Sequence, residues 1–171
     1  PGRYNISFLD AVSSCAYVAT VGDPANALVY APSGVYTGSG PNTKTVYIGT
    51  KNPGGGLQGG IPFHLAVICP NATRAHAIVV TSAGLPSRGT SLTSAYNAAR
   101  GRYVAVNKVN SASCATVATR GSVDRPVPFA PATLEIVAGP AANTVGIEVR
   151  DLLFFGGAVN NAAFHAATVC P

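Results

Sequence analysis

Short runs of apolar and β-branched residues, separated by turn residues, recur along the whole chain. In the run TVGIEVRD, for example, Val145, Ile147 and Val149 alternate with Glu148 and Arg150. Successive side chains of a β-strand point to opposite faces, so this alternation predicts a strand with one buried face and one solvated face. Glycine, proline, asparagine and aspartate separate the runs and favour turns. The pattern therefore predicts an all-β protein of short antiparallel strands.

The chain matches itself when it is shifted by 99 positions. Seventeen of the 47 residues from 2 to 48 are identical to their counterparts between 101 and 147. Two residues are then inserted, and at an offset of 101 the run FHLAVICP (63–70) matches FHAATVCP (164–171). Self-similarity at a fixed period indicates a repeated structural unit. We call 2–70 the first copy and 101–171 the second copy, and we predict two tandem antiparallel β-sandwich domains of immunoglobulin-like architecture.

All four cysteines fall on matching positions of the two copies. Four cysteines allow three pairings, and the duplication favours one bridge inside each copy, Cys15–Cys69 and Cys114–Cys170. In the chain-entropy model each bridge stabilises the fold by about 4 kcal/mol. Structural disulfides persist in oxidising compartments, so we expect a secreted or cell-surface protein. A chain that begins at Pro1 is also what we expect after removal of a leader.

The predicted domains are 1–90 and 101–171, joined by a linker at 91–100 that contains the best helix candidate, SLTSAYNAAR. A strand near 75–82 has no counterpart after the second copy. Three assignments are open for this strand. It completes the first sandwich and leaves the second with an open edge, it crosses over to complete the second domain, or it decorates the first domain. Open edges recruit strands from other chains.

The composition limits the classes of partner. Charged residues make up only 10% of the chain and hydrophobic residues 47%, so either small polar residues cover the surface or part of it is buried against other molecules. The net charge of +5 comes from scattered residues. Nucleic-acid binders carry a basic stripe with interleaved aromatic residues, which is missing here, so we expect no nucleic-acid partner. No run of eighteen apolar residues predicts a membrane-spanning helix.

No group of residues has the pattern of a reaction centre. His64 and His165 occupy matching positions, each five residues before a cysteine. A catalytic histidine needs a carboxylate and a nucleophile beside it, and a duplicated histidine next to a disulfide favours a structural role. The carboxylates are scattered, and no close cysteine pair or acidic loop predicts a metal site. We therefore expect no enzyme activity, no cofactor and no bound metal.

The leading functional prediction is an extracellular structural protein, the subunit of a surface filament, coat or wall-associated assembly held by strand addition and apolar contacts. Its expected partners are copies of itself or another extracellular protein. The expected assembly contacts lie at the edge of the second copy and in an apolar cluster: Leu152, Leu153, Phe154, Phe155 and Val169.

The alternative is a secreted carbohydrate- or protein-binding module, in which the partner is a glycan or a protein. Tyrosines of the predicted strands are the candidates for stacking on sugars: Tyr17, Tyr30, Tyr36 and Tyr47. Two sequons, at Asn5 and Asn71, are N-glycosylation sites if the host is eukaryotic.

Overall fold

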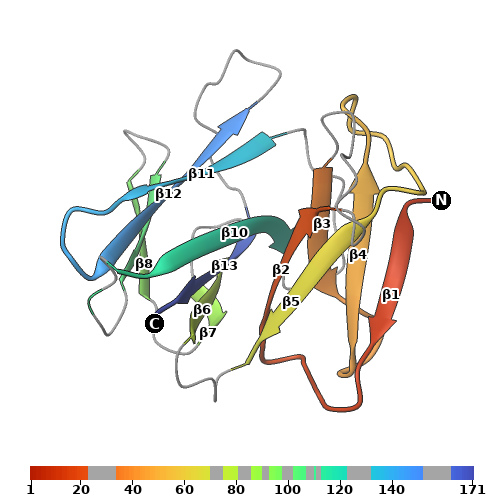
Figure 1. Ribbon diagram of the computed structural model, residues 1–171, viewed down its shortest axis with the longest axis horizontal. Helices are drawn as coiled ribbons and strands as arrows, with labels where there is room; N and C mark the ends of the chain where they lie inside the picture. Colours follow the sequence, from red (N-terminus) through yellow and green to blue (C-terminus); the bar gives the residue numbers. More distant parts are fainter. Residues whose placement is uncertain are drawn as a thin grey trace.

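The computed structural model describes most of the chain. The described residues are 1–22, 34–69, 75–80, 86–89, 93–97, 102–106, 110, 113–122, 132–151 and 163–171. Every regular element within them is a β-strand, which confirms the all-β prediction (Figure 1). The strands of the first copy are β1 (Arg3–Ser7), β2 (Ala16–Val21), β3 (Gly34–Ser39), β4 (Thr45–Lys51) and β5 (Phe63–Ile68). Between the copies lie β6 (Ala75–Val80), β7 (Pro86–Gly89) and β8 (Thr93–Asn97). The second copy holds β9 (Arg102–Val106), β10 (Ala115–Ser122), β11 (Ala132–Ala138), β12 (Thr144–Asp151) and β13 (Phe164–Val169).

The strands form three sheets that pack face to face, as in a β-sandwich. The largest has the order β1-β4-β3-β10-β13-β6-β7, the second β11-β12-β9-β8, and the third consists of β2 and β5. All pairings between the described strands are antiparallel except one: β10 pairs parallel with β3, at Gly121 opposite Thr37 and Ser122 opposite Gly38. This short parallel contact joins the first copy to the second within one continuous sheet.

The strand pairings of the two copies correspond to each other. In the β1–β4 pair Arg3 lies opposite Gly49, and in the β9–β12 pair Arg102 lies opposite Glu148, which is the same pairing moved by 99 positions. The β3–β4 pair recurs in the same way as β11–β12, and the β2–β5 pair as β10–β13. This agreement of registers is what a duplicated unit predicts.

The segment between the copies adds its strands to the sheets of the second copy. β6 pairs with β13, β7 pairs with β6, and β8 pairs with β9. The crossing-over assignment is thus the one observed for residues 75–80. The expected helix in 91–100 is wrong, because Thr93–Asn97 form β8. The backbone of β8 pairs with the edge of β9, and such tertiary pairing overrides the helix preference of alanine.

The expected open edge of the second copy near Cys170 is wrong for the same reason. β13 is flanked by β10 on one side and by β6 on the other. In the first copy the counterpart of β13 is β5, and within the described part of the chain β5 pairs with β2 alone. Among the described strands, β6 therefore covers the edge of β13, whereas none covers the corresponding edge of β5.

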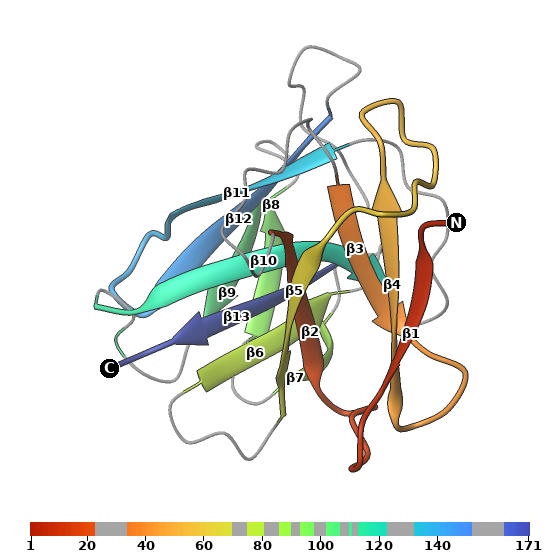
Figure 2. The same cartoon turned by 45° about the vertical axis from the view of Figure 1, so that its right-hand side comes forward.

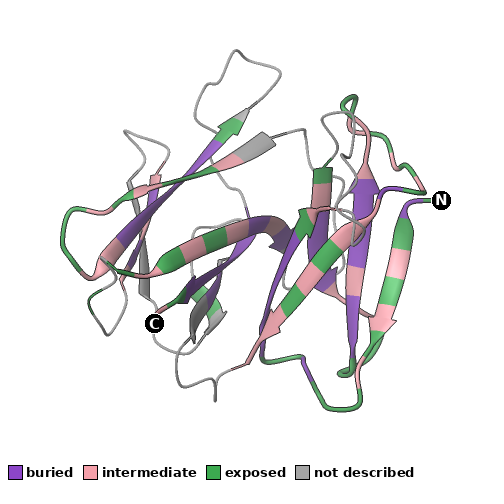
Figure 3. Ribbon diagram, in the orientation of Figure 1, coloured by how far each residue is buried: buried purple, intermediate pink, exposed green. Residues whose placement is uncertain are grey.

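Each copy has its own apolar core, and β2 contributes to a third cluster between them. Tyr17 on one face of β2 packs in a cluster with Val46 and Ile48 of β4. On its other face Ala16 and Val18 pack against Val79 of β6 and Ala167 of β13. Figures 1 and 2 show β2 and β5 between the first-copy sheet and the strands of the second copy. β2 is thus buried on both faces, and Figure 3 shows the contrast between buried β13 and half-exposed β5.

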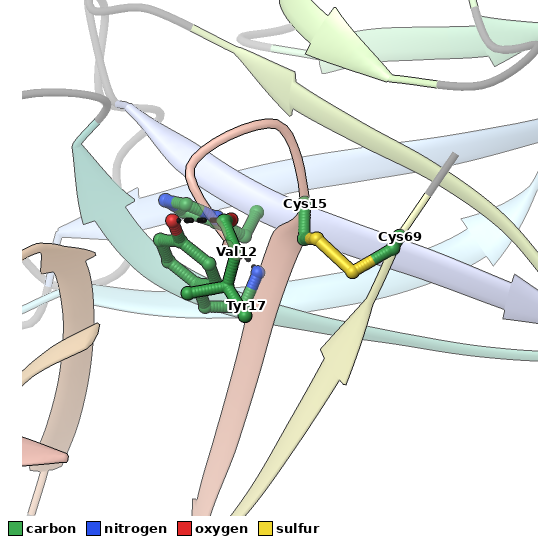
Figure 4. Close-up of a disulfide and its surroundings, with 5 residues drawn as sticks. Val12, Cys15, Tyr17 and Cys69 are labelled. Atoms are coloured by element: carbon green, nitrogen blue, oxygen red, sulfur yellow. Dashed lines mark hydrogen bonds between the residues drawn. A yellow bond between two sulfur atoms is a disulfide. The ribbon is translucent and has the colours of Figure 1, made fainter. Parts of the chain in front are cut away.

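The predicted disulfide pairing is confirmed. Cys15 is bonded to Cys69 and Cys114 to Cys170, one bridge in each copy. Figure 4 shows the first bridge close to Tyr17, whose hydroxyl donates a hydrogen bond to the backbone carbonyl of Val12 at 2.8 Å. The two bridges indicate an oxidising environment, because such bonds are rare in reducing compartments.

Candidate functional site

Side chains, rather than a neighbouring strand, satisfy the outer edge of β2. The N–H of Tyr17 donates to Nδ1 of His165 at 3.0 Å. The N–H of Ala19 donates to Oγ1 of Thr119, and that hydroxyl donates to the carbonyl of Ala19, both at 2.8 Å. The hydroxyl of Thr37 donates to the carbonyl of Tyr17 at 3.1 Å. An edge of the first copy is thus held mainly by a face of the second copy, and we call this contact the junction.

The junction uses Nδ1 of His165 as a hydrogen-bond acceptor. Its ring is fully buried and stacks on Tyr17, with ring centres 5.1 Å apart. Because Nδ1 accepts a hydrogen bond from a backbone N–H, this nitrogen carries no proton in the contact. The ring also lies against Gly121, where a Cβ atom would fall 2.7 Å from Cδ2 of His165. Within the junction, His165 therefore acts as a hydrogen-bond acceptor for a strand edge.

The first copy carries matching residues at the matching end of the β2–β5 pair, and none of the described strands covers them. Thr20 lies opposite His64 in the β2–β5 pair, as Thr119 lies opposite His165 in the β10–β13 pair. The ring of His64 lies against Gly22 as closely as its counterpart lies against Gly121, since a Cβ on Gly22 would fall 2.5 Å from Cδ2 of His64. Thr119 and His165 are buried, whereas Thr20 and His64 are exposed. We call Thr20, His64 and Gly22 the first-copy face.

The second copy in turn carries the counterpart of the β2 edge. β10 pairs with β3 only at its last two residues, so no described strand lies along this edge from 115 to 120. Tyr17 and Ala19 turn their backbone groups away from β5, and the equal register turns those of Thr116 and Ala118 away from β13. We call the backbone of Thr116 and Ala118 the β10 edge.

Apolar surface surrounds the β10 edge. A groove of about 560 Å³ lies between β10 and the β11–β12 hairpin and is lined by Thr116, Ile136 and Val145, among others. Val117, next to the edge, is 47% exposed, and Ile136 is also exposed. In the first copy the counterpart of Ile136 is Thr37, which bonds the β2 edge.

The structure locates some of the residues predicted from sequence. Val169 is exposed at the end of β13, and Asn5 is exposed on β1. The cluster Leu152 to Phe155, Asn71 and Tyr30 lie outside the described residues. Tyr17 is fully buried in the core and is not accessible to a sugar. Sequence reasoning missed the threonines of the junction, although their identity at positions 20 and 119 was a usable signal.

A second groove, of about 510 Å³, lies on the outer face of the first-copy sheet. Its lining includes Arg3, Asn5, Tyr36, Tyr47 and Lys51. The rings of Tyr36 and Tyr47 have their centres 6.0 Å apart, and the ammonium of Lys51 lies 5.2 Å from the ring centre of Tyr36. We call this site the tyrosine groove.

Burial affects both titratable groups at the centre of the tyrosine groove. Burial, helped by a hydrogen bond with Tyr47, raises the pKa of Tyr36 well above its usual range, while the charge of Arg3 opposes this rise. Burial also lowers the pKa of Lys51, and the positive charge of Arg120 lowers it further. The groove is therefore partly desolvated and lies in a positive field.

The corresponding face of the second copy carries an ion-pair network. Nε of Arg102 donates to Oε1 of Glu148 at 2.7 Å, and Nε of Arg150 donates to Oε2 of Glu135 at 2.7 Å. Arg150 also donates to Oε2 of Glu148 at 2.5 Å. The hydrogen bonds from Arg102, with the charges of both arginines, hold the pKa of Glu148 below its usual range against the effect of burial. This face neutralises its own cations.

No three histidine, cysteine, aspartate or glutamate residues among those placed come together as a metal site would require. The described elements include no helix that is long and apolar enough to cross a membrane.

Comparisons of the chain with protein-family models, with curated proteins and with solved structures found no match.

Proposed function

We propose that the protein is an extracellular structural subunit, built from two β-sandwich units of one duplicated sequence, that assembles with further copies of itself. The observation that carries this proposal is the junction. It joins an edge of one copy to a face of the other, and each copy also carries the element that its sibling uses there. The two sides of the junction thus have counterparts on the surface of the molecule, the first-copy face and the β10 edge.

The junction is directional, and this decides the kind of assembly. An edge binds a face, so the two partners contribute different surfaces. When two molecules form one such contact, each still has one unused surface, which is a face on one molecule and an edge on the other. Repetition of the contact gives a closed ring or an open filament. A filament, coat or wall-associated layer is therefore the form of assembly that we propose.

The intermolecular contact would follow the chemistry of the junction. In a neighbouring molecule, the N–H of Thr116 would donate to Nδ1 of His64, as that of Tyr17 does to His165. The backbone of Ala118 would bond the hydroxyl of Thr20, as that of Ala19 bonds Thr119. Side chains that hydrogen-bond the backbone of a strand edge satisfy its N–H and carbonyl groups, which would otherwise make the edge costly to bury.

Apolar contacts and strand addition support the same assembly. Val117, Ile136 and Val169 expose apolar surface on the second copy, which an interface would cover. The edge of β5 corresponds to the edge of β13 that receives β6, so it is the position where a strand of another chain would add. The low content of charged residues, 10%, agrees with a protein whose surface is largely covered.

The oligomeric state of the purified, oxidised protein tests this proposal. We expect sedimentation velocity to show species larger than the 17.2 kDa monomer, with a proportion that rises with protein concentration. Electron microscopy of the same samples should show rings or filaments. A protein that stays monomeric up to millimolar concentration contradicts the proposal.

A second candidate function is a secreted carbohydrate-binding module, and the tyrosine groove is the observation that favours it. Its tyrosines lie beside polar and charged side chains, the mixture by which small-molecule sites fix the position of a ligand. A monomer that binds an immobilised glycan would support this candidate over self-assembly.

A further inference from the structure

Strand β1 ends the seven-stranded sheet, whereas its counterpart β9 lies inside a sheet. β1 pairs with β4 in the same register in which β9 pairs with β12. On its other side β9 pairs antiparallel with β8, with Arg102 opposite Asn97 and Val106 opposite Thr93. Figures 1 and 2 show β1 at the rim of the molecule, and none of the described strands lies along its other side. Among the described strands, the first copy thus lacks the antiparallel neighbour that the second copy has.

The backbone groups of β1 that face away from β4 belong to its odd-numbered residues. The carbonyl of Gly2 accepts a hydrogen bond from the N–H of Thr50 of β4 at 2.9 Å. Every second residue of an antiparallel strand bonds the same neighbour, so the even-numbered residues of β1 bond β4 and the residues between them point outward. We call the outward backbone of Arg3, Asn5 and Ser7 the β1 edge.

The two ends of the seven-stranded sheet differ in their protection against further pairing. At the far end, β7 has only four residues, begins at Pro86 and carries Arg88, and its pairing with β6 shifts register between Val79 and Val80. Short strands, prolines, charges and bulges keep a sheet edge from recruiting another chain. β1 is paired regularly over its whole length, contains no proline and has one charged residue, Arg3. The β1 edge is therefore the end of this sheet that suits an added strand.

We propose that the β1 edge pairs with the β1 edge of a second copy of the chain, antiparallel and across a twofold axis at Asn5. The register that overlaps all five residues of both strands places Asn5 opposite Asn5 and Arg3 opposite Ser7. Because the backbone groups of these residues face outward, each pair exchanges hydrogen bonds. No like charges lie opposite each other in this register.

β1 meets the requirements for pairing with itself. Tyr4 and Ile6 are half-buried and pack against the core of the first copy, so the two paired strands continue that core across the axis. Tyr4 of each strand lies opposite Ile6 of the other, and such aromatic and β-branched pairs stabilise antiparallel strands. The second β1 also has the same length, five residues, as the β8 strand that fills the matching edge of β9.

The twofold contact differs from the edge-to-face contact of the proposed function. A twofold contact uses the same surface on both molecules and is complete in a dimer, whereas the edge-to-face contact is directional. The twofold contact therefore joins two filaments or rings side by side and does not lengthen them. It shares with the proposed function only the association of copies of the chain, and it involves neither the first-copy face nor the β10 edge.

Sedimentation equilibrium of the variant Thr20→Val with His64→Phe isolates the twofold contact, because this variant lacks the first-copy face. We expect an equilibrium between monomer and dimer, and a variant that stays monomeric up to millimolar concentration overturns the proposal. Adding Asn5→Lys should weaken the dimer by about tenfold or more, because two like charges then lie opposite each other. Asn5→Ala is the matched control and should leave the dimer unchanged, and equal effects of the two substitutions overturn the proposal. Asn5→Lys alone keeps the first-copy face, so its assembly tests the proposed function separately.

A mixture of two charged variants tests the register. In the same background, Asn5→Asp should weaken the dimer as Asn5→Lys does. When the two proteins are mixed in equal amounts, we expect heterodimers, because opposite charges then face each other across the axis. Native mass spectrometry distinguishes the heterodimer from both homodimers. A mixture that forms no more dimer than its separate components overturns the pairing at Asn5.

Discussion

The hydroxyl of Thr119 bonds both backbone polar groups of Ala19, a residue one hundred positions earlier in the chain. It accepts from the N–H and donates to the carbonyl, each at 2.8 Å, in a buried site. One threonine thus replaces two hydrogen bonds that a neighbouring strand would otherwise supply. This contact, with that of His165 to Tyr17, allows the edge of β2 to be buried against the second copy.

Thr119→Val should destabilise the fold strongly. Valine has nearly the same shape but leaves the N–H and carbonyl of Ala19 buried without a partner, at a cost of about 2–4 kcal/mol in the free energy of unfolding. Urea denaturation of the oxidised protein measures the change. Thr20→Val is the matched control, because Thr20 is exposed at the equivalent position, and it should change the free energy by less than about 0.5 kcal/mol. Equal effects of the two substitutions would contradict the role assigned to Thr119.

The first-copy face should affect assembly without affecting stability. We expect Thr20→Val combined with His64→Phe to weaken self-association by about tenfold or more, because the β10 edge of a neighbour then finds no acceptor for its N–H groups. Sedimentation equilibrium at several protein concentrations measures the change. Thr43→Val with Lys44→Ala, an exposed pair on the turn before β4, is the control. If the substitutions at Thr20 and His64 do not change assembly, the protein still self-associates, but the contact lies at another surface.

Glu148 should make stability depend on pH in the acid range. Hydrogen bonds from Arg102 lower the pKa of its carboxyl in the folded protein, so the unfolded chain binds the proton more tightly. The stabilisation is therefore complete above the unfolded pKa of about 4.3 and is lost as the pH falls through the lower, folded pKa. Unfolding free energies measured from pH 6 to pH 2 should fall less steeply for Glu148→Gln than for the wild type. An unchanged slope in Glu148→Gln would contradict the prediction.

The two disulfides should contribute about equally to stability. They close loops of similar length, with sequence separations of 54 and 56 residues. In the chain-entropy model, Cys15→Ala with Cys69→Ala and Cys114→Ala with Cys170→Ala should each cost about 4 kcal/mol. Denaturant unfolding of the two double variants gives the comparison. A large difference between them would show that the copies unfold unequally in spite of their matched bridges.

Part of the candidate site could be predicted from sequence and part could not. The match of His64 with His165 and of Thr20 with Thr119 is visible in the repeat, and it favoured a structural role for the histidines. These identities do not indicate in which copy the histidine and threonine are covered by a strand edge, because identical residues give identical local patterns. In the sequence, the tyrosine groove appears only as a difference between the copies, with glycine at 49 and glutamate at 148. Which cations lie beside that position is known only from the strand pairing.

The sequence by itself determined most of the strands within the two copies, the correspondence of the copies and the pairing of the cysteines. These features follow from side-chain alternation and from repetition, both of which are local properties of the chain. Only the tertiary structure decided that β6 lies beside β13, and that the edge of β2 is held by Thr119 and His165. Residues 63–68 and 164–169 have similar sequences, yet β5 has one neighbour and β13 has two. The physical reason is that the groups covering a strand edge come from distant segments of the chain, and the local sequence of the edge strand does not indicate which segment reaches it.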